Sequence, residues 1–277
     1  MSLVPKAKSH ASIQQQKVGI GTKSLLMTSH ETSDSVTLYV GGHELYCLNV
    51  NIIKPTSPMA RVIDPAIANL QKIEYNQQCS LEGNFKCGLD TNIILKFIIT
   101  YIKTTYPHVT GLSFNDASFR TCDNGAQVSL AMMSYMTSGK TWYQNNFGAF
   151  LDAKSDSIFK KVESEFQQKK SIVTWEILKG MIDIPIYEET MKEMYESAKT
   201  WQEFFGPLKD LLGINEFCIF IAPWFDTFIK NYMRFNMMGL LYIIPIEDYG
   251  VVYTLSEYQR GGKAYTRKRI NRHLDER

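Results

Sequence analysis

Between residues 90 and 114 the sequence has the apolar pattern of a helix with one buried face, followed directly by a short apolar run. The apolar positions recur at intervals of three and four residues, at Ile94, Phe97, Ile98, Tyr101 and Ile102. This period is that of an α-helix with one buried face. Asp90 can cap the helix and Pro107 ends it, and residues 109–114 then have the length of a strand.

A second helix is expected after the turn pair Asn124-Gly125, with an end at Gly139, because glycine readily takes the left-handed conformation that ends a helix. Its apolar positions are Val128, Leu130, Met133 and Met136. A helix, a strand and a second helix in this order are what a layered α/β domain requires. The sequence therefore predicts an α/β fold with a mixed sheet flanked by helices.

Alternating apolar residues before Gly41-Gly42 predict a β-hairpin with a two-residue turn. Val36, Leu38 and Val40 alternate with other residues, and residues 45–50 are again β-rich. Residues 1–33, by contrast, are rich in Ser, Thr, Gln and Lys and show no periodicity. We therefore expect a flexible N-terminal arm over residues 1–33, with the folded domain beginning at residue 34.

The pattern changes in the second half of the chain to charged amphipathic helices. Helical stripes of apolar residues lie at 158–166, 191–198 and 201–211. Residues 217–222 and 239–246 are apolar runs of buried-strand length, separated by a helix that bears Phe225. These runs predict a second α/β half over residues 153–256, and whether it is a separate domain stays open. A basic C-terminal tail is expected over residues 257–277.

The cysteines of the chain are odd in number and scattered: Cys47, Cys79, Cys87, Cys122 and Cys218. The spacing of Cys79 and Cys87, with no histidine partner, is not that of a zinc site. We therefore expect five reduced thiols in a thiol-reducing compartment, and no metal. No apolar signal segment begins the chain, and the uncharged stretch at 236–246 is too short for a membrane span. Neither export nor membrane insertion is expected.

Positive charge is concentrated at the two ends. The formal net charge is only +2, yet residues 1–23 hold four lysines and no acid, and residues 259–277 hold seven basic residues against two acids. Candidate contacts to nucleic acid or to an acidic partner are Lys263, Arg267, Lys268, Arg269 and Arg272. A solvated C-terminus explains the same residues, so both readings stay open.

Two segments invite comparison with phosphate-binding loops, and neither fits. The run Ser138-Gly139-Lys140-Thr141 has Ser134 where a nucleotide-binding loop needs glycine, and a helix leads into it. Residues 16–21 (Gln-Lys-Val-Gly-Ile-Gly) match the pattern with which acetyltransferases grip a coenzyme A pyrophosphate, but no strand is expected before them. The five histidines are isolated. No complete catalytic, metal or nucleotide motif is present, although an active site assembled from dispersed residues stays open.

Three short segments resemble uncharacterised proteins of nucleocytoplasmic large DNA viruses. They are residues 111–118 (Gly-Leu-Ser-Phe-Asn-Asp-Ala-Ser), 122–125 (Cys-Asp-Asn-Gly) and 139–149 (Gly-Lys-Thr-Trp-Tyr-Gln-Asn-Asn-Phe-Gly-Ala). The viral segment is in turn similar to the distal part of the GNAT acetyltransferase fold, in which a helix ends in a Tyr-x-x-x-Gly-Phe-type turn. Residues 143–148 can occupy the equivalent place. The resemblance thus implies a GNAT-like α/β region over residues 34–152.

In an active enzyme of this kind, the resemblance implies acetyl-CoA as cofactor and Tyr143 as the general acid. A pyrophosphate loop is not found where it is needed, because residues 120–125 have the pattern of a turn. We therefore expect Trp142, Tyr143 and Phe147 to pack in the core. The prediction is a structural or interaction protein with no cofactor, built on a catalytically degenerate acetyltransferase-like fold. An active acetyl-CoA-dependent N-acetyltransferase is the alternative.

For such a protein the resemblance implies a virion or minor capsid component, present in the host cytoplasm during assembly. Its partners would be other viral structural proteins, reached through the two ends of the chain. Those ends have too little apolar surface to offset the ordering of the backbone, roughly 1 to 2 kcal/mol per residue. We therefore expect rapid proteolysis near Lys17, near Lys23 and at residues 267–269.

Overall fold

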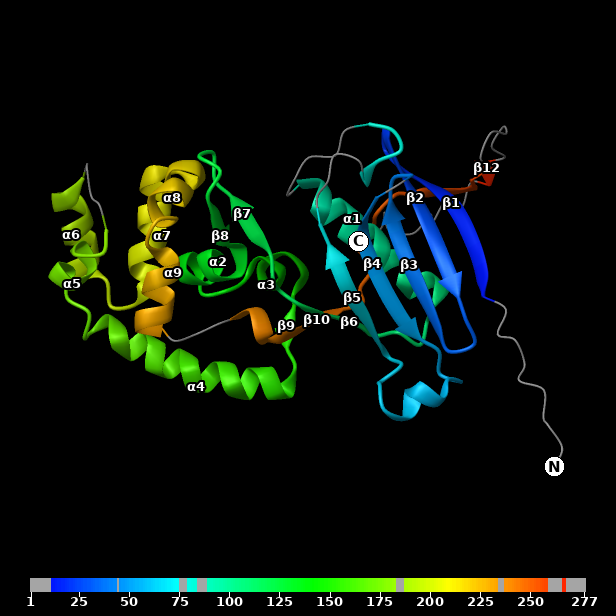
Figure 1. Cartoon of the computed structure of the whole chain (residues 1–277), viewed down its shortest axis with the longest axis horizontal. Helices are drawn as coiled ribbons and strands as arrows, with labels where there is room; N and C mark the ends of the chain where they lie inside the picture. The colour runs from blue at the N-terminus through cyan, green and yellow to red at the C-terminus, as the bar shows by residue number, and fades with distance from the viewer. Residues whose placement is uncertain are drawn as a thin grey trace, which may run out of the picture. The chain divides into compact units, whose positions relative to one another are not determined.

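The computed structural model describes residues 11–43, 45–74, 79–83, 89–182, 187–233, 237–258 and 266–267. It forms two compact units, which are described separately below (Figure 1). Unit 1 comprises Met1–Phe114 and Pro245–Arg277, and unit 2 is the continuous segment Asn115–Ile244. The expected boundary at residue 152 is therefore replaced by a division after Phe114, and both ends of the chain belong to one unit.

Unit 1 is built on a mixed sheet with the strand order β12-β11-β1-β2-β3-β4-β5-β6. The strands are β1 (Ser12–Ile20), β2 (Lys23–Glu31), β3 (Ser35–Gly41), β4 (Tyr46–Ile53), β5 (Ile67–Ile73), β6 (Gly111–Asn115), β11 (Thr254–Glu257) and β12 (Thr266–Arg267). Neighbours are antiparallel except β5 and β6, which are parallel. The hairpin expected around residue 40 is confirmed as β3 and β4. Its connection is longer than two residues, because β3 ends at Gly41 and β4 begins at Tyr46. Within the connection the Gly42 amide donates to the Leu45 carbonyl.

The flexible arm expected over residues 1–33 is wrong for residues 12–31, which are β1 and β2. Polar residues dominate β1 because only Val18 is buried along it, so the strand lacks the apolar alternation by which strands are recognised. Gly21 has φ +60° and forms the turn between the two strands, a conformation that glycine adopts without steric cost. Residues 16–21, which match the pattern of a pyrophosphate loop, therefore belong to a β-hairpin.

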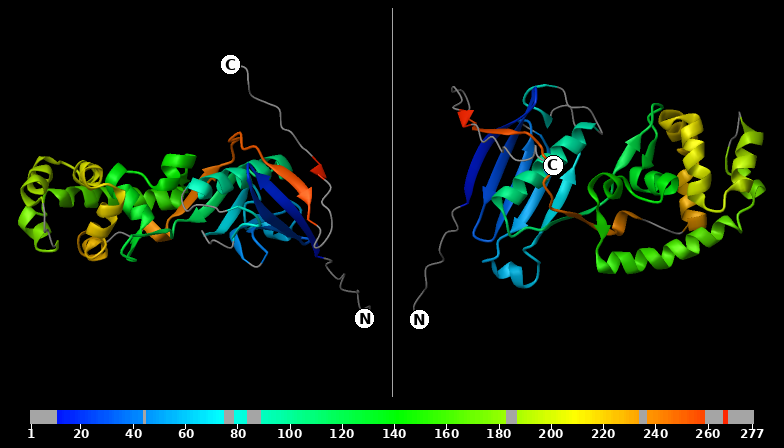
Figure 2. Two further views of the ribbon diagram at one scale, coloured as in Figure 1. Left: turned by 90° about the horizontal axis from the view of Figure 1, so that it is seen from above. Right: turned by 180° about the vertical axis from the view of Figure 1, so that it is seen from behind.

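Helix α1 (Leu89–Thr105) connects the parallel strands β5 and β6 and lies across one face of the sheet (Figure 2, right). Its five predicted apolar positions are all buried, which confirms the expected packing. Val36, Leu38 and Val40 of β3 are buried as well and form part of the same core. Since successive side chains of a strand point to opposite faces, the intervening residues of β3 point away from α1.

Unit 2 is mainly helical. Its helices are α2 (Leu130–Ser138), α3 (Trp142–Phe147), α4 (Ala153–Lys170), α5 (Trp175–Lys179), α6 (Glu188–Ser197), α7 (Trp201–Leu212), α8 (Ile214–Ile221) and α9 (Phe225–Phe228), with a short π-helix η3 (Ile229–Met233) and a 3-10 helix η4 (Met237–Gly239). The strands β7 (Phe119–Thr121) and β8 (Gln127–Ser129) form a hairpin, and β9 (Phe150–Leu151) pairs with β10 (Leu241–Pro245). The predicted helix end at Gly139 is confirmed, with φ +75°.

The strand expected at residues 217–222 is wrong, because these residues belong largely to α8. Phe217, Cys218 and Ile221 are buried and lie one and four positions apart, which is the spacing of one helix face. A short apolar run cannot distinguish a buried strand from a buried helix by periodicity alone. In the same unit, Trp201, Phe204, Phe205, Trp224 and Phe228 form one aromatic cluster.

The expectation of five reduced thiols is also wrong. Cys122 and Cys218 form a disulfide within unit 2, with Cα atoms 5.5 Å apart. The two residues are separated by 96 positions in the sequence, so no local spacing could reveal the pair. Cys47 and Cys79 are buried free thiols, and Cys87 lies outside the described residues. Within the described part of the chain, no helix has both the length and the apolar character needed to cross a membrane.

Candidate functional site

The basic residues predicted at the C-terminus can be placed only in part. Lys263, Lys268, Arg269 and Arg272 lie outside the described residues. The backbone of Arg267 belongs to β12, where it pairs with Leu255 of β11. This part of the tail is therefore the edge of the sheet of unit 1.

Tyr143, the predicted general acid, lies in the first turn of α3. Thr141 caps this helix and forms a capping box with Gln144, so the run Ser138-Gly139-Lys140-Thr141 is a helix end followed by a helix start. The Tyr143 side chain is 4% exposed. Burial, and to a lesser degree the nearby Asp116, raise the pKa of Tyr143. A general acid works best when its pKa lies near the working pH, so this environment favours packing over proton transfer.

Asp116 is the most unusual carboxyl group of unit 2. It is 2% exposed, and its Oδ1 accepts hydrogen bonds from the amide and the hydroxyl of Ser118. Its Oδ2 is buried with no hydrogen-bond partner among the described residues. Burial raises the pKa of Asp116, and its charge contributes to the raised pKa of both Tyr143 and Tyr242. The group therefore favours its neutral form more than an exposed Asp does.

The N-terminus of α1 already carries a negatively charged side chain of the helix itself. Asp90 lies in the first turn, where the helix dipole favours negative charge. Its side chain is only 3% exposed, and both carboxylate oxygens accept from Lys23 Nζ, at 2.8 and 2.7 Å. A phosphate approaching this helix end would have to compete with the Asp90 carboxylate for the same positive potential.

The sheet face of unit 1 opposite α1 is the most extended candidate site. No helix among the described residues of unit 1 covers it, and it faces the viewer in Figure 1. Polar side chains point out of this face in pairs across neighbouring strands. Asn49 Nδ2 donates to Gln71 Oε1 at 2.9 Å, Asn69 Nδ2 to Ser113 Oγ at 3.3 Å, and Thr37 Oγ1 to Asn51 Oδ1 at 3.5 Å. Asn69 and Gln71 are exposed to solvent.

A row of aromatic rings crosses the same face. The His30 and Tyr39 rings are edge to face with centroids 5.2 Å apart, and Tyr39 and Tyr46 are arranged likewise at 4.9 Å. Lys72 Nζ lies 5.3 Å from the Tyr46 ring centroid, within the range of a cation–π contact. The row links β2, β3 and β4 and ends at an exposed ring, since Tyr46 is 40% exposed.

The charges bordering this face are paired with one another. Lys72 Nζ contacts Glu74 Oε2 at 2.7 Å, and Lys17 Nζ contacts Glu82 Oε2 at 2.7 Å. These pairs are partly or largely solvent-exposed, so each contributes little to stability. Their effect on the surface is to leave the centre of the face to neutral amide, hydroxyl and aromatic groups.

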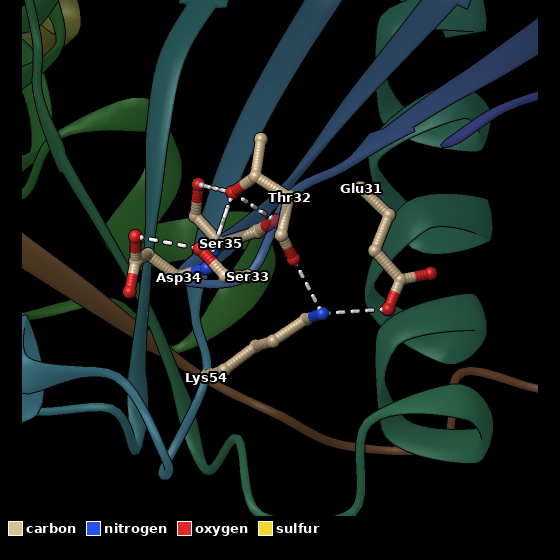
Figure 3. Close-up of polar contacts among 6 residues, drawn as sticks. All are labelled: Glu31, Thr32, Ser33, Asp34, Ser35 and Lys54. Atoms are coloured by element: carbon tan, nitrogen blue, oxygen red, sulfur yellow. Dashed lines mark hydrogen bonds and ion pairs between the residues drawn. The ribbon is translucent and has the colours of Figure 1, made fainter. Parts of the chain in front are cut away.

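One end of the face is held by a network at the turn between β2 and β3 (Figure 3). Lys54 Nζ donates to the Thr32 carbonyl at 2.6 Å and contacts Glu31 Oε1 at 2.7 Å. Thr32 Oγ1 accepts from the amides of Asp34 and Ser35, which closes the turn.

The same turn anchors the loop after β4. Ser57 Oγ donates to Asp34 Oδ1 at 3.1 Å and accepts from the Met59 amide, capping the short helix η1 (Pro58–Arg61). This helix and the loop that follows it present Met59, Val62 and Ile63 to solvent, with Val62 89% exposed. An anchored loop with three exposed apolar side chains is a second feature suited to contact with another molecule.

The sequence contained a signal for the open face that the sequence analysis did not use. Polar or aromatic residues alternate with buried apolar ones in β3 at Thr37 and Tyr39, and in β4 at Asn49 and Asn51. Alternation predicts that these residues share one face. The strand order that brings β3, β4 and β5 side by side depends on long-range pairing, which the pattern of a single strand does not contain.

Comparisons with protein-family models, with curated proteins and with solved structures gave no match.

Proposed function

We propose that this chain is a binding or structural protein that uses the open sheet face of unit 1 to contact a partner protein. The observation that carries the proposal is the face itself: an array of amide, hydroxyl and aromatic groups with no helix of the described unit over it. Tyrosine is enriched at protein interfaces, and asparagine and serine provide adaptable hydrogen bonds in binding surfaces.

The charges favour a protein partner over nucleic acid at this face. Binding to nucleic acid depends on unpaired Lys and Arg side chains that neutralise phosphates. Here Lys72 and Lys17 are each paired with a glutamate. Depletion of charged residues at an aromatic centre, with polar groups at the rim, is instead typical of a protein interface.

The viral setting remains part of the proposal. The resemblance of residues 111–149 to proteins of large DNA viruses supports a virion or minor capsid component that assembles in the host cytoplasm. The partner would then be another structural protein of the particle. Contacts through the basic tail, including Lys263 and Arg272, are compatible with this role.

An active acetyltransferase is kept as the second candidate because of one observation. Strand β5, helix α1 and the parallel strand β6 form a β-α-β unit, the arrangement in which a helix N-terminus can receive a coenzyme pyrophosphate. Asp90 argues against this use, since its buried carboxylate already lies in the first turn of α1. Calorimetric titration with acetyl-CoA separates the candidates: we expect no binding heat, and a micromolar dissociation constant would support the enzyme.

The proposed interface can be tested by adding charge to it. The variant Asn69→Lys/Gln71→Lys changes two exposed positions of the face, and Asn145→Lys/Gln168→Lys changes the same residue types at exposed positions of unit 2. Tagged proteins would be isolated from the cells that naturally produce the chain and their partners quantified. We expect a partner protein that is retained by the wild type and the control but lost from the face variant. Equal recovery with all three proteins would refute the interface.

A further inference from the structure

Two free thiols of unit 1 are neighbours. Cys47 is on β4 and Cys79 lies in the connection between β5 and α1, where its Sγ lies 3.7 Å from the carbonyl oxygen of Glu74, the residue whose amide donates to the Cys47 carbonyl. The Cys79 thiol also contributes to the raised pKa of Cys47. Both are buried, with exposed fractions of 4% and 1%. Cys47 Sγ also donates to the Val40 carbonyl and Cys79 Sγ to the Glu74 carbonyl.

Backbone hydrogen bonds on both sides of Cys79 fix this arrangement. Before it, the Glu74 amide donates to the carbonyl of Cys47 itself at 2.7 Å. After it, the Leu81 amide donates to the Ser24 carbonyl, and the Ser24 amide donates to the Glu82 carbonyl, both at 2.9 Å. The position of Cys79 beside β4 is therefore set by the paired backbone and not by the thiol alone.

The disulfide of unit 2 bears on the state of these thiols. A bond such as Cys122–Cys218 is favoured where an oxidant or a thiol oxidoreductase is present. Two neighbouring thiols would meet the same oxidant while the chain folds. We propose that Cys47 and Cys79 form a second disulfide under the conditions that maintain the Cys122–Cys218 bond.

The chemistry requires a disulfide reagent, either a small molecule or a thiol oxidoreductase. The Cys79 thiolate attacks one sulfur of the reagent and releases the other as a thiolate, giving a mixed disulfide. Cys47 then loses its proton and attacks Cys79 Sγ, which displaces the second reagent thiol. Two protein thiols are oxidised and one reagent disulfide is reduced to two thiols. Burial raises the pKa of Cys47, so the reaction belongs to folding, before the pair is enclosed.

The test uses the full chain refolded in a mixture of oxidised and reduced glutathione. Remaining thiols are alkylated with N-ethylmaleimide in denaturant, and tryptic peptides are analysed by mass spectrometry without reduction. Trypsin cleaves after Lys72 and Lys86, which places Cys79 and Cys87 on separate peptides. The three possible pairings among Cys47, Cys79 and Cys87 are therefore distinguishable.

We expect a crosslinked peptide pair that joins Cys47 to Cys79, with Cys87 alkylated. A Cys87→Ser variant should retain the pair, and a Cys79→Ser variant should leave Cys47 alkylated. The inference is overturned if Cys47 and Cys79 are both alkylated while Cys122 and Cys218 are joined, or if either thiol pairs with Cys87. Detection of the crosslinked peptides that contain Cys122 and Cys218 in the same digest shows that the oxidant was effective.

Discussion

Cys122, at the turn that follows β7, is covalently joined to Cys218 in α8, so the β7–β8 hairpin is tied to the helical part of unit 2. The bond closes a loop with a sequence separation of 96 residues. In the chain-entropy account a closed loop of this length stabilises the folded state by about 4 to 5 kcal/mol. The bond is therefore expected to be a major contribution to the stability of unit 2.

The first prediction is that reduction of the Cys122–Cys218 disulfide lowers the free energy of unfolding of unit 2 by about 4 kcal/mol. Urea unfolding followed by tryptophan fluorescence measures this unit alone, because Trp142, Trp175, Trp201 and Trp224 all lie within it. The control is a Cys122→Ser/Cys218→Ser variant, whose transition should not move when reductant is added. Unchanged stability of the reduced wild type would contradict the prediction.

The second prediction concerns Asp116. Burial raises the pKa of Asp116 in the folded state, so folding disfavours the ionised form of this side chain. The buried carboxyl group therefore lowers the stability of the protein as pH rises above about 3.9, the pKa of Asp in an unfolded chain. An Asp116→Asn variant keeps the Oδ1 acceptor for Ser118 and removes the buried charge. We expect its free energy of unfolding to be about 1 kcal/mol higher than that of the wild type at neutral pH. This difference should disappear below the pKa of Asp in the unfolded chain.

A control of opposite sign is available for that experiment. Asp152 caps α4, and hydrogen bonds from Ser155 lower its pKa. Its contribution to stability is present above the unfolded pKa and lost as pH falls through the lowered folded pKa. Asp152→Asn should therefore lose stability at neutral pH. An Asp116→Asn variant that is less stable at every pH would show that the carboxylate has a partner of its own.

The third prediction tests the ion pair at the start of α1. Lys23→Met removes the ammonium group that contacts both oxygens of the Asp90 carboxylate, which is 3% exposed. We expect a loss of about 2 kcal/mol, because removing one partner of a buried ion pair is costly. Replacing both partners, as Lys23→Met/Asp90→Leu, should recover part of this loss. Urea unfolding followed by circular dichroism provides the measurement, with Lys72→Met as the exposed control, expected to change stability by under about 0.5 kcal/mol.

The fourth prediction concerns proteolysis of the N-terminal hairpin. Lys17 in β1 is paired with Glu82, and Lys23 in β2 with Asp90. Backbone held in a sheet cannot enter a protease active site without local unfolding. We expect both lysines to resist trypsin in the folded protein and to be cleaved rapidly in urea. Cleavage at Lys17 at the same rate under both conditions would indicate that β1 is not paired in solution.

The sequence predicted best those elements whose own pattern is strong. The helical stripe of Ile94, Phe97 and Ile98 and the helix end at Gly139 were both confirmed. These features depend on local periodicity and on the conformational freedom of glycine, which a short stretch of sequence contains.

The features that were missed depend on distant parts of the chain. Strand β1 is polar and is held by backbone pairing with β2 and β11, and α8 buries an apolar face in unit 2. The Cys122–Cys218 bond and the Cys47–Cys79 pair each join segments far apart in sequence. The open face was missed for the same reason, since its residues come from several strands.

Site-specific photocrosslinking tests the central claim, that the open sheet face binds a partner protein, most directly. A benzophenone amino acid is placed at Asn69 on the face or at Asn145 in unit 2, both exposed positions, in cells that naturally produce the chain. We predict that irradiation links position 69 to one defined partner protein, and that position 145 gives no such product. Absence of any crosslink from position 69, or the same products from both positions, would contradict the proposed interface.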